Sequence, residues 1–139
     1  MVSTVLVPMD DSEMATKALE FAIDAHPNAN ITVLHVVGGL TPYMGGPAGL
    51  ALADDIDELA RERSNEVFTT ARDVATKYDK EIETAIDFGQ PAEAIIKQAK
   101  DFDVVVIGAH THDLVSRFLV GNVASTVSRD APVPVTVVR

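Results

Sequence analysis

Cysteine is absent from the 139-residue sequence, and this absence excludes disulfide scaffolds, thiolate zinc sites and cysteine nucleophiles. No stretch approaches the ~20 uninterrupted apolar residues that a membrane-spanning helix needs. Residues 1–4 (MVST) lack the positive charge that begins a signal peptide. We therefore expect a cytoplasmic protein, and the length predicts a single α/β domain over residues 1–139.

Basic residues are scarce: 11 Lys and Arg face 21 Asp and Glu, which gives a formal net charge of -10. Such a charge repels phosphate backbones and anionic lipid headgroups, so we expect neither a nucleic-acid partner nor a membrane. Only five of the basic residues are lysines. An acidic, lysine-poor surface fits a source rich in salt and an ordinary acidic cytosolic protein equally well.

Short β-branched runs alternate with segments of helical periodicity along the whole chain. The runs predict strands at 2–8, 31–37, 81–87, 103–107 and 134–138. Helices are expected from about residue 14, from 50 to 78, from 91, and as one or two segments between 114 and 129. This order predicts an open parallel sheet with helices on both faces. The alternating run 81–87 is typical of a strand near the sheet edge, and the apolar run 103–107 of a central one.

The sequence also indicates how the first helix is capped, where a long loop lies, and which residues of the long helix face inward. Either Asp11 or Ser12 could cap the first helix. Residues 38–49 hold five glycines and two prolines and are predicted to form a long loop. Helical spacing predicts seven inward positions in the long helix: Leu52, Ile56, Leu59, Ala60, Val67, Ala71 and Val74.

Ligands of open parallel sheets bind beyond the carboxyl ends of the strands, which directs attention to residues 9–12, the loop from Gly38, and residues 108–122. Gly108 could let backbone approach a ligand, and Gly121 could open a helix whose free N–H groups attract phosphates, with Arg117 between them. The alternative is that both glycines serve packing only. Asp10 could accept hydrogen bonds from ribose hydroxyls or hold a metal through water, or it could be a turn residue beside the helix cap.

Catalytic chemistry finds little support in the sequence. His35 lies in an apolar strand and is expected to be a hydrogen-bonded histidine near the core. His110 and His112 are better placed to touch a ligand, but no acidic partner stands at triad or zinc spacing. Ser12 lacks the setting of a hydrolase nucleophile. We expect no catalytic residues and no metal site, and at most a slow ATPase.

Taken together, the segments VLVPMDDSEMATKALEFAI, ITVLHVV, FGQP, DVVVIGAHTH and APVPVTVV resemble the universal stress protein family over essentially the whole chain. The resemblance implies a Rossmann-like, five-stranded parallel sheet of order 3-2-1-4-5 and a homodimer, often through the last strand. For one branch of the family it also implies binding of ATP, with or without Mg²⁺.

In that branch, the loop after the fourth strand reads glycine, two residues, glycine, nine residues, then glycine followed by serine or threonine. Gly108 and Gly121 match the first and third glycines, whereas Thr111 and Asn122 replace the second glycine and the hydroxyl residue. The β-carbon of Thr111 disfavours positive φ and adds bulk where phosphates would pass. The full set of predicted nucleotide-contacting residues is Pro8, Met9, Asp10, Val36, Gly108, His110, Thr111, Gly121, Asn122 and Val123. Asp10 would contact the ribose, Pro8, Met9 and Val36 would line the adenine pocket, and the Val36 backbone would read the base edge.

These residues favour a stress-response protein that binds adenine nucleotide, weakly because of the altered phosphate loop. The alternative within the same family is a dimeric interaction or regulatory protein without nucleotide. A response-regulator receiver would use Asp10, Asp11 and Asp87, but it needs a lysine after the fifth strand and none stands in residues 134–139.

Overall fold

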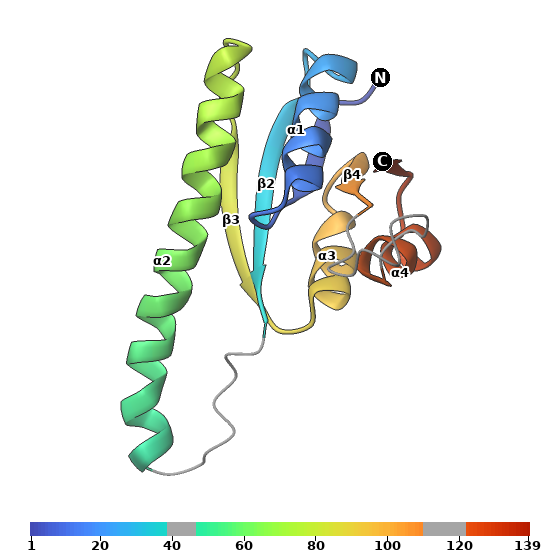
Figure 1. Cartoon of the computed structure of the whole chain (residues 1–139). Helices are drawn as coiled ribbons and strands as arrows, with labels where there is room; N and C mark the ends of the chain where they lie inside the picture. The colour runs from blue at the N-terminus through green and yellow to red at the C-terminus, as the bar shows by residue number, and fades with distance from the viewer. Residues whose placement is uncertain (39–46, 110–121) are drawn as a thin grey trace.

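The computed structural model describes residues 1–38, 47–109 and 122–139, without the side chains of 47–57. Five parallel strands form one sheet in the order β3-β2-β1-β4-β5 (Figure 1). The strands are β1 (Thr4–Pro8), β2 (Asn30–Val37), β3 (Glu83–Phe88), β4 (Val104–Gly108) and β5 (Val135–Val138). The helices are α1 (Glu13–Ala25), α2 (Pro47–Lys77), α3 (Pro91–Ala99) and α4 (Asn122–Asp130). The predicted open parallel sheet and the strand order 3-2-1-4-5 are confirmed.

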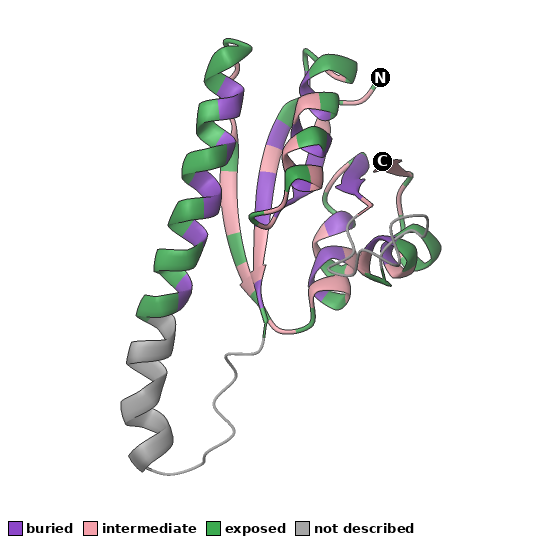
Figure 2. Cartoon of the chain, viewed as in Figure 1, coloured by how far each residue is buried: buried purple, intermediate pink, exposed green. Residues whose placement is uncertain are grey.

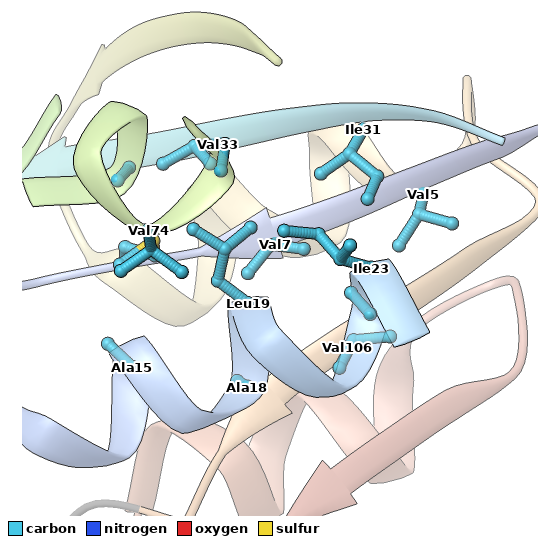
Figure 3. Close-up of a cluster of buried hydrophobic side chains, with 14 of the residues drawn as sticks. Val5, Val7, Ala15, Ala18, Leu19, Ile23, Ile31, Val33, Val74 and Val106 are labelled. Atoms are coloured by element: carbon cyan, nitrogen blue, oxygen red, sulfur yellow. The ribbon is translucent and has the colours of Figure 1, made fainter. Parts of the chain in front are cut away.

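The helices form two layers because each face of the sheet is apolar. On one face, α1 and α2 pack against β1, β2 and β4 in a cluster of buried side chains. In Figure 3, Leu19 and Ile23 of α1 lie against Val5 and Val7 of β1 within this cluster. On the other face, α3 and α4 bury Leu6, Leu34 and neighbouring residues in a second cluster. Full burial of one such side chain contributes about 1.5–3 kcal/mol, so both faces stabilise the sheet.

The strand order places β3 and β5 at the two edges and β1 at the centre. The edge position of β3 confirms the expectation from its alternating sequence. β4 lies inside the sheet and all five of its residues are buried, as its uniformly apolar sequence predicts. Since the strands are parallel, their carboxyl ends all lie at one end of the sheet and their amino ends at the other. We call these two ends the carboxyl edge and the amino edge, as distinct from the outer strands β3 and β5.

Local capping fixes how the chain leaves the carboxyl edge. Ser12 is the N-cap of α1: its backbone is extended, and its Oγ accepts a hydrogen bond of 3.2 Å from the Ala15 N–H. Of the two candidate caps, the structure therefore selects Ser12. At the turn into α3, Gly89 has φ of 112° and Pro91 occupies the first helical turn, which explains the sequence FGQP.

The long helix α2 differs from the sequence prediction in two respects. It begins at Pro47 rather than near Leu50, so the end of the predicted glycine-rich loop is helical; proline suits the first helical turn because its missing N–H needs no partner there. Leu59 is 40% exposed and does not face the core, because the adjacent Ala60 takes the inward position. The inward positions of Ala60, Val67, Ala71 and Val74 are confirmed and form a buried stripe along α2 (Figure 2).

Several sequence expectations fall on residues that the structure does not describe. These are the loop at 39–46, the inward positions Leu52 and Ile56, and the start of the helical segment expected from residue 114. The described part of that segment is α4. No helix in the described ranges is long and apolar enough to cross a membrane.

Candidate functional site

The strand order creates a switch point beside β1. From β1 the chain moves outward through β2 and β3, then returns to place β4 on the other side of β1. The helices that leave β1 and β4 therefore lie on opposite faces of the sheet, and a crevice at the carboxyl edge is expected between them. The sequence-predicted residues Pro8, Met9, Asp10, Val36 and Gly108 all lie at this edge, at or just past the ends of β1, β2 and β4.

The backbone of Val36 is directed toward this switch point. The Leu34 carbonyl accepts a hydrogen bond of 2.8 Å from the Met9 N–H on the β1 side, and the Val37 carbonyl accepts one of 3.1 Å from the Gly89 N–H on the β3 side. In a parallel strand, neighbouring residues alternate the side to which their N–H and C=O point. The N–H and C=O of Val36 therefore both point to the β1 side. Val36 lies two residues beyond Leu34, whose register partner Pro8 is the last residue of β1. A donor and an acceptor side by side can pair with the edge of a heterocyclic base.

Asp10 has a structural role in the turn that links β1 to α1. Its Oδ1 accepts a hydrogen bond of 2.9 Å from the Ser12 N–H, and Ser12 in turn caps α1. This is the turn role that the sequence left open as an alternative to ligand binding. Asp10 is half-buried and lies at the switch point, where its carboxylate can in addition accept from a ligand hydroxyl, because each carboxylate oxygen has two lone pairs. Met9 beside it is buried in the core cluster under α1.

Gly108 is required for packing, whatever else it does. A β-carbon at this position would lie 2.6 Å from the carbonyl oxygen of Met14 and 2.8 Å from its carbonyl carbon. These are backbone atoms in the first turn of α1, so they cannot move aside as a flexible side chain would. The packing alternative left open by the sequence thus accounts for this glycine by itself. The next residue, Ala109, continues the pairing with β5 through a hydrogen bond of 2.7 Å from its N–H to the Val138 carbonyl.

The phosphate half of the predicted site is only partly described. Asn122 and Val123 begin α4; Asn122 is exposed, and Val123 is half-buried against the second core cluster. His110, Thr111 and Gly121 lie outside the described residues, as do His112 and Arg117. Of the predicted site, the structure thus describes the residues of the adenosine half, at the carboxyl edge, and the first two residues of α4.

Sequence reasoning missed Ser64, which lies on α2 next to the last residues of β2. His35 of β2 and Ser64 of α2 form a hydrogen bond of 2.7 Å between Nδ1 and Oγ. Burial lowers the pKa of His35 below its ordinary value, and the positive charge of Arg63 acts in the same direction, whereas the negative charges of Asp10 and Asp11 oppose it. Ser64 could have been noticed because it is a polar residue at an inward position of the helical stripe. The expectation that His35 is a hydrogen-bonded residue near the core is confirmed.

The described side chains at the carboxyl edge are of the kinds that bind a nucleoside. Within the described ranges, no three His, Asp or Glu side chains gather as metal ligands would. The carboxyl edge instead offers a carboxylate, a backbone donor and acceptor, and apolar neighbours, a combination suited to a ribose and a base.

Comparison with known proteins agrees with this geometry. The model of the family described as "Universal stress protein family" matches residues 1–139. A universal stress protein of Methanocaldococcus jannaschii is 30% identical over 97% of this chain and 81% of its own length. The structure of the universal stress protein UspA from Lactobacillus plantarum superposes with a TM-score of 0.78 at 30% identity, covering 99% of this chain and 98% of that one.

Two more distant structures share the fold and were solved with nucleotides. One is a universal stress protein in complex with cAMP, with a TM-score of 0.67 and 22% identity over 99% of this chain and 97% of its own. The other is a family member from Arabidopsis thaliana with AMP bound, with a TM-score of 0.61 and 16% identity over 98% of this chain and 90% of its own.

Proposed function

This chain belongs to the universal stress protein family, and from that premise we propose that it binds an adenine nucleotide at the carboxyl edge of β1, β2 and β4 and acts in a stress response. The observation that carries the proposal is the direction of the Val36 backbone, whose N–H and C=O point past the end of β1 beside Asp10. The cAMP and AMP complexes of two structural neighbours support a nucleotide as the ligand class.

The adenosine half of the ligand is expected to contribute more to the binding free energy than the phosphate half. In the adenosine half, Val36 would pair with the base edge and Asp10 would accept from ribose hydroxyls. In the phosphate half, Thr111 and Asn122 stand where the ATP-binding branch has glycine and a hydroxyl residue. ATP, with or without Mg²⁺, should therefore bind only modestly more tightly than AMP. At most slow hydrolysis of ATP is expected.

Calorimetric titration with Mg-ATP, AMP and cAMP tests this proposal directly. Asp10→Asn keeps an oxygen for the Ser12 turn but removes the charge, and it should weaken all three ligands by about tenfold because a charged hydrogen-bond acceptor is lost. The matched control is Asp11→Asn, an exposed neighbour that should leave affinity unchanged. Thr111→Gly should tighten ATP but not AMP. Absence of heat with every nucleotide at millimolar concentration would reject nucleotide binding.

That negative outcome would favour the second candidate function, a dimeric interaction protein without nucleotide. Two observations support it: Gly108 is explained by packing on Met14, and β5 is an edge strand whose sequence VTVV carries no charge. An uncharged edge strand can pair with the same strand of a second copy. In either case we propose a homodimer through β5 in the cytoplasm. Sedimentation of the wild-type chain and of Val137→Lys would test the dimer: since Val137 also packs against the second core cluster, loss of the dimer is expected in a variant that still unfolds cooperatively.

A further inference from the structure

Two polar residues interrupt two otherwise apolar surfaces and meet each other. Ser64 lies at an inward position of α2, between the buried residues Ala60 and Val67, and its exposed fraction is 0%. His35 lies on the face of β2 that α2 covers, two residues beyond the buried Val33. Their hydrogen bond of 2.7 Å satisfies the buried hydroxyl. A buried polar pair of this kind gives the helix one preferred position on the strand, because any shift leaves a hydroxyl without its partner.

The surroundings of the His35 ring combine apolar neighbours on α2 and β3 with charged groups from the β1–α1 turn and from α2. Phe68, one helical turn after Ser64, approaches the ring edge-on, with centroids 6.5 Å apart and an interplanar angle of 87°. The side chain that pairs with His35 in register on β3 is Ile86, which is also apolar. The charged groups that act on the ring are Asp10 and Asp11 from the β1–α1 turn and Arg63 from α2.

We infer that the His35–Ser64 pair is a pH-sensitive contact that holds α2 on β2, so that acidification loosens the part of α2 that lies beside the candidate site. A loosened helix exposes the imidazole to water, where it takes up a proton more readily than between α2 and β2. Burial lowers the pKa of His35 in the docked state, and the attraction of Asp10 and Asp11 does not reverse that direction. The docked state therefore binds fewer protons, and falling pH favours the loosened one.

The contact has a direct route to the carboxyl edge. His35 immediately precedes Val36, and its ring projects to the α2 side while the Val36 backbone points to the switch point beside β1. His35 and Ser64 are thus positioning residues for the end of β2. This inference concerns the docking of α2 and does not depend on nucleotide binding, so it can fail or stand separately from the proposed function.

Amide hydrogen exchange of the full chain without ligand, followed from pH 7.5 to 5.5, tests the inference. After correction for intrinsic exchange, amides of residues 58–68 should open more readily at the lower pH, whereas those of α3 should not. If the loosened state has an ordinary histidine pKa of about 6.5, the increase is at most about tenfold. His35→Asn, which keeps a hydrogen-bonding atom near the position of Nδ1, should abolish this pH dependence. Ser64→Ala should raise exchange in α2 at both pH values.

The matched control is His26→Asn, which removes a histidine at the C-cap of α1 on the amino edge. This variant should keep the wild-type pH response. Exchange in α2 that does not change with pH, or that changes equally in His35→Asn, would overturn the inference. If the His35 variant does not fold, the ring of His35 can be titrated by NMR in the wild-type chain. A midpoint above that of a free histidine would overturn the inference, and one below it, rising in Ser64→Ala, would support it.

Discussion

The two edges of the sheet use their polar groups in different ways. At the amino edge, polar side chains bind the protein's own backbone: Asp103 Oδ2 accepts from the N–H groups of Ser3 and Thr4 at 2.7 and 3.1 Å. Lys80 Nζ donates to the carbonyls of Pro27 and Ala29 at 3.0 and 2.6 Å. At the carboxyl edge, backbone groups of a strand point past the end of its neighbour.

This difference separates stability from function. The contacts of the amino edge join segments far apart in the sequence, so they contribute to the free energy of unfolding. The carboxyl edge combines contacts that hold the fold, such as the Asp10 turn, with groups directed to the switch point. Under the proposed function, substitutions at the amino edge should therefore change stability and leave nucleotide affinity unchanged, and only substitutions at the carboxyl edge should affect both.

The largest loss of stability is expected at the carboxyl edge, from Gly108→Ala. The new β-carbon would overlap backbone atoms of Met14, so α1 must shift away from β4. We expect a loss of about 3 kcal/mol in the free energy of unfolding, measured by urea denaturation. Gly38→Ala is the matched control, because its β-carbon would lie 3.2 Å from the nearest atom, the Gly89 carbonyl oxygen, which is a tight contact but a longer one than the 2.6 Å at Gly108. A Gly108 variant as stable as the Gly38 variant would contradict the packing explanation.

At the amino edge, Lys80→Met should have an intermediate effect. Methionine retains the apolar stem but removes two charged hydrogen bonds to the carbonyls that follow α1. The expected loss is about 1–2 kcal/mol, again from urea denaturation. The exposed Lys77 at the end of α2 provides the control, since Lys77→Met removes the same charge without those bonds. Equal stabilities of the two variants, or a change in nucleotide affinity in Lys80→Met, would contradict the separation of the two edges.

Sequence patterns predicted the elements of this fold because those patterns are local. The alternation of residues 81–87 indicated an edge strand, and FGQP indicated the turn at Gly89, since periodicity and turn chemistry depend on near neighbours. The strand order came from the family resemblance. The local patterns did not separate Leu59 from Ala60 in α2, because adjacent helical residues differ by only about 100° in direction.

The contacts at the carboxyl edge could not be read in the same way. Gly108 and Met14 are far apart in sequence, and so are His35 and Ser64, so only the tertiary structure shows that each pair meets. For this reason the sequence left two explanations of Gly108 open and gave Ser64 no partner. The Val36 backbone was implicated by resemblance, and the register of β1 with β2 now gives the physical reason.

The smallest effect at neutral pH is expected from Asp103→Asn, because both N–H groups donate to the same oxygen and an amide oxygen in its place can still accept from them. Its consequence lies in the acid range. Hydrogen bonds from the Ser3 N–H, first, and from the Thr4 N–H lower the pKa of Asp103 in the folded state. A carboxyl group with a lowered folded pKa contributes stability that is present above its unfolded pKa of about 3.9 and is lost as the pH falls through the folded value. The wild-type chain should therefore lose stability more steeply below pH 4 than Asp103→Asn does.

Thermal unfolding between pH 2.5 and 5 measures this difference, with the exposed neighbour Asp101→Asn as the control that should follow the wild-type curve. Parallel curves for Asp103→Asn and the wild type would mean that the Asp103 contacts do not persist in solution. Because the exposed carboxylate lies at the amino edge, nucleotide affinity at pH 7 should be identical in the two chains. A reduced affinity would show that the two edges are coupled through β1 or β4, and stability and binding could then not be assigned to opposite edges of the sheet.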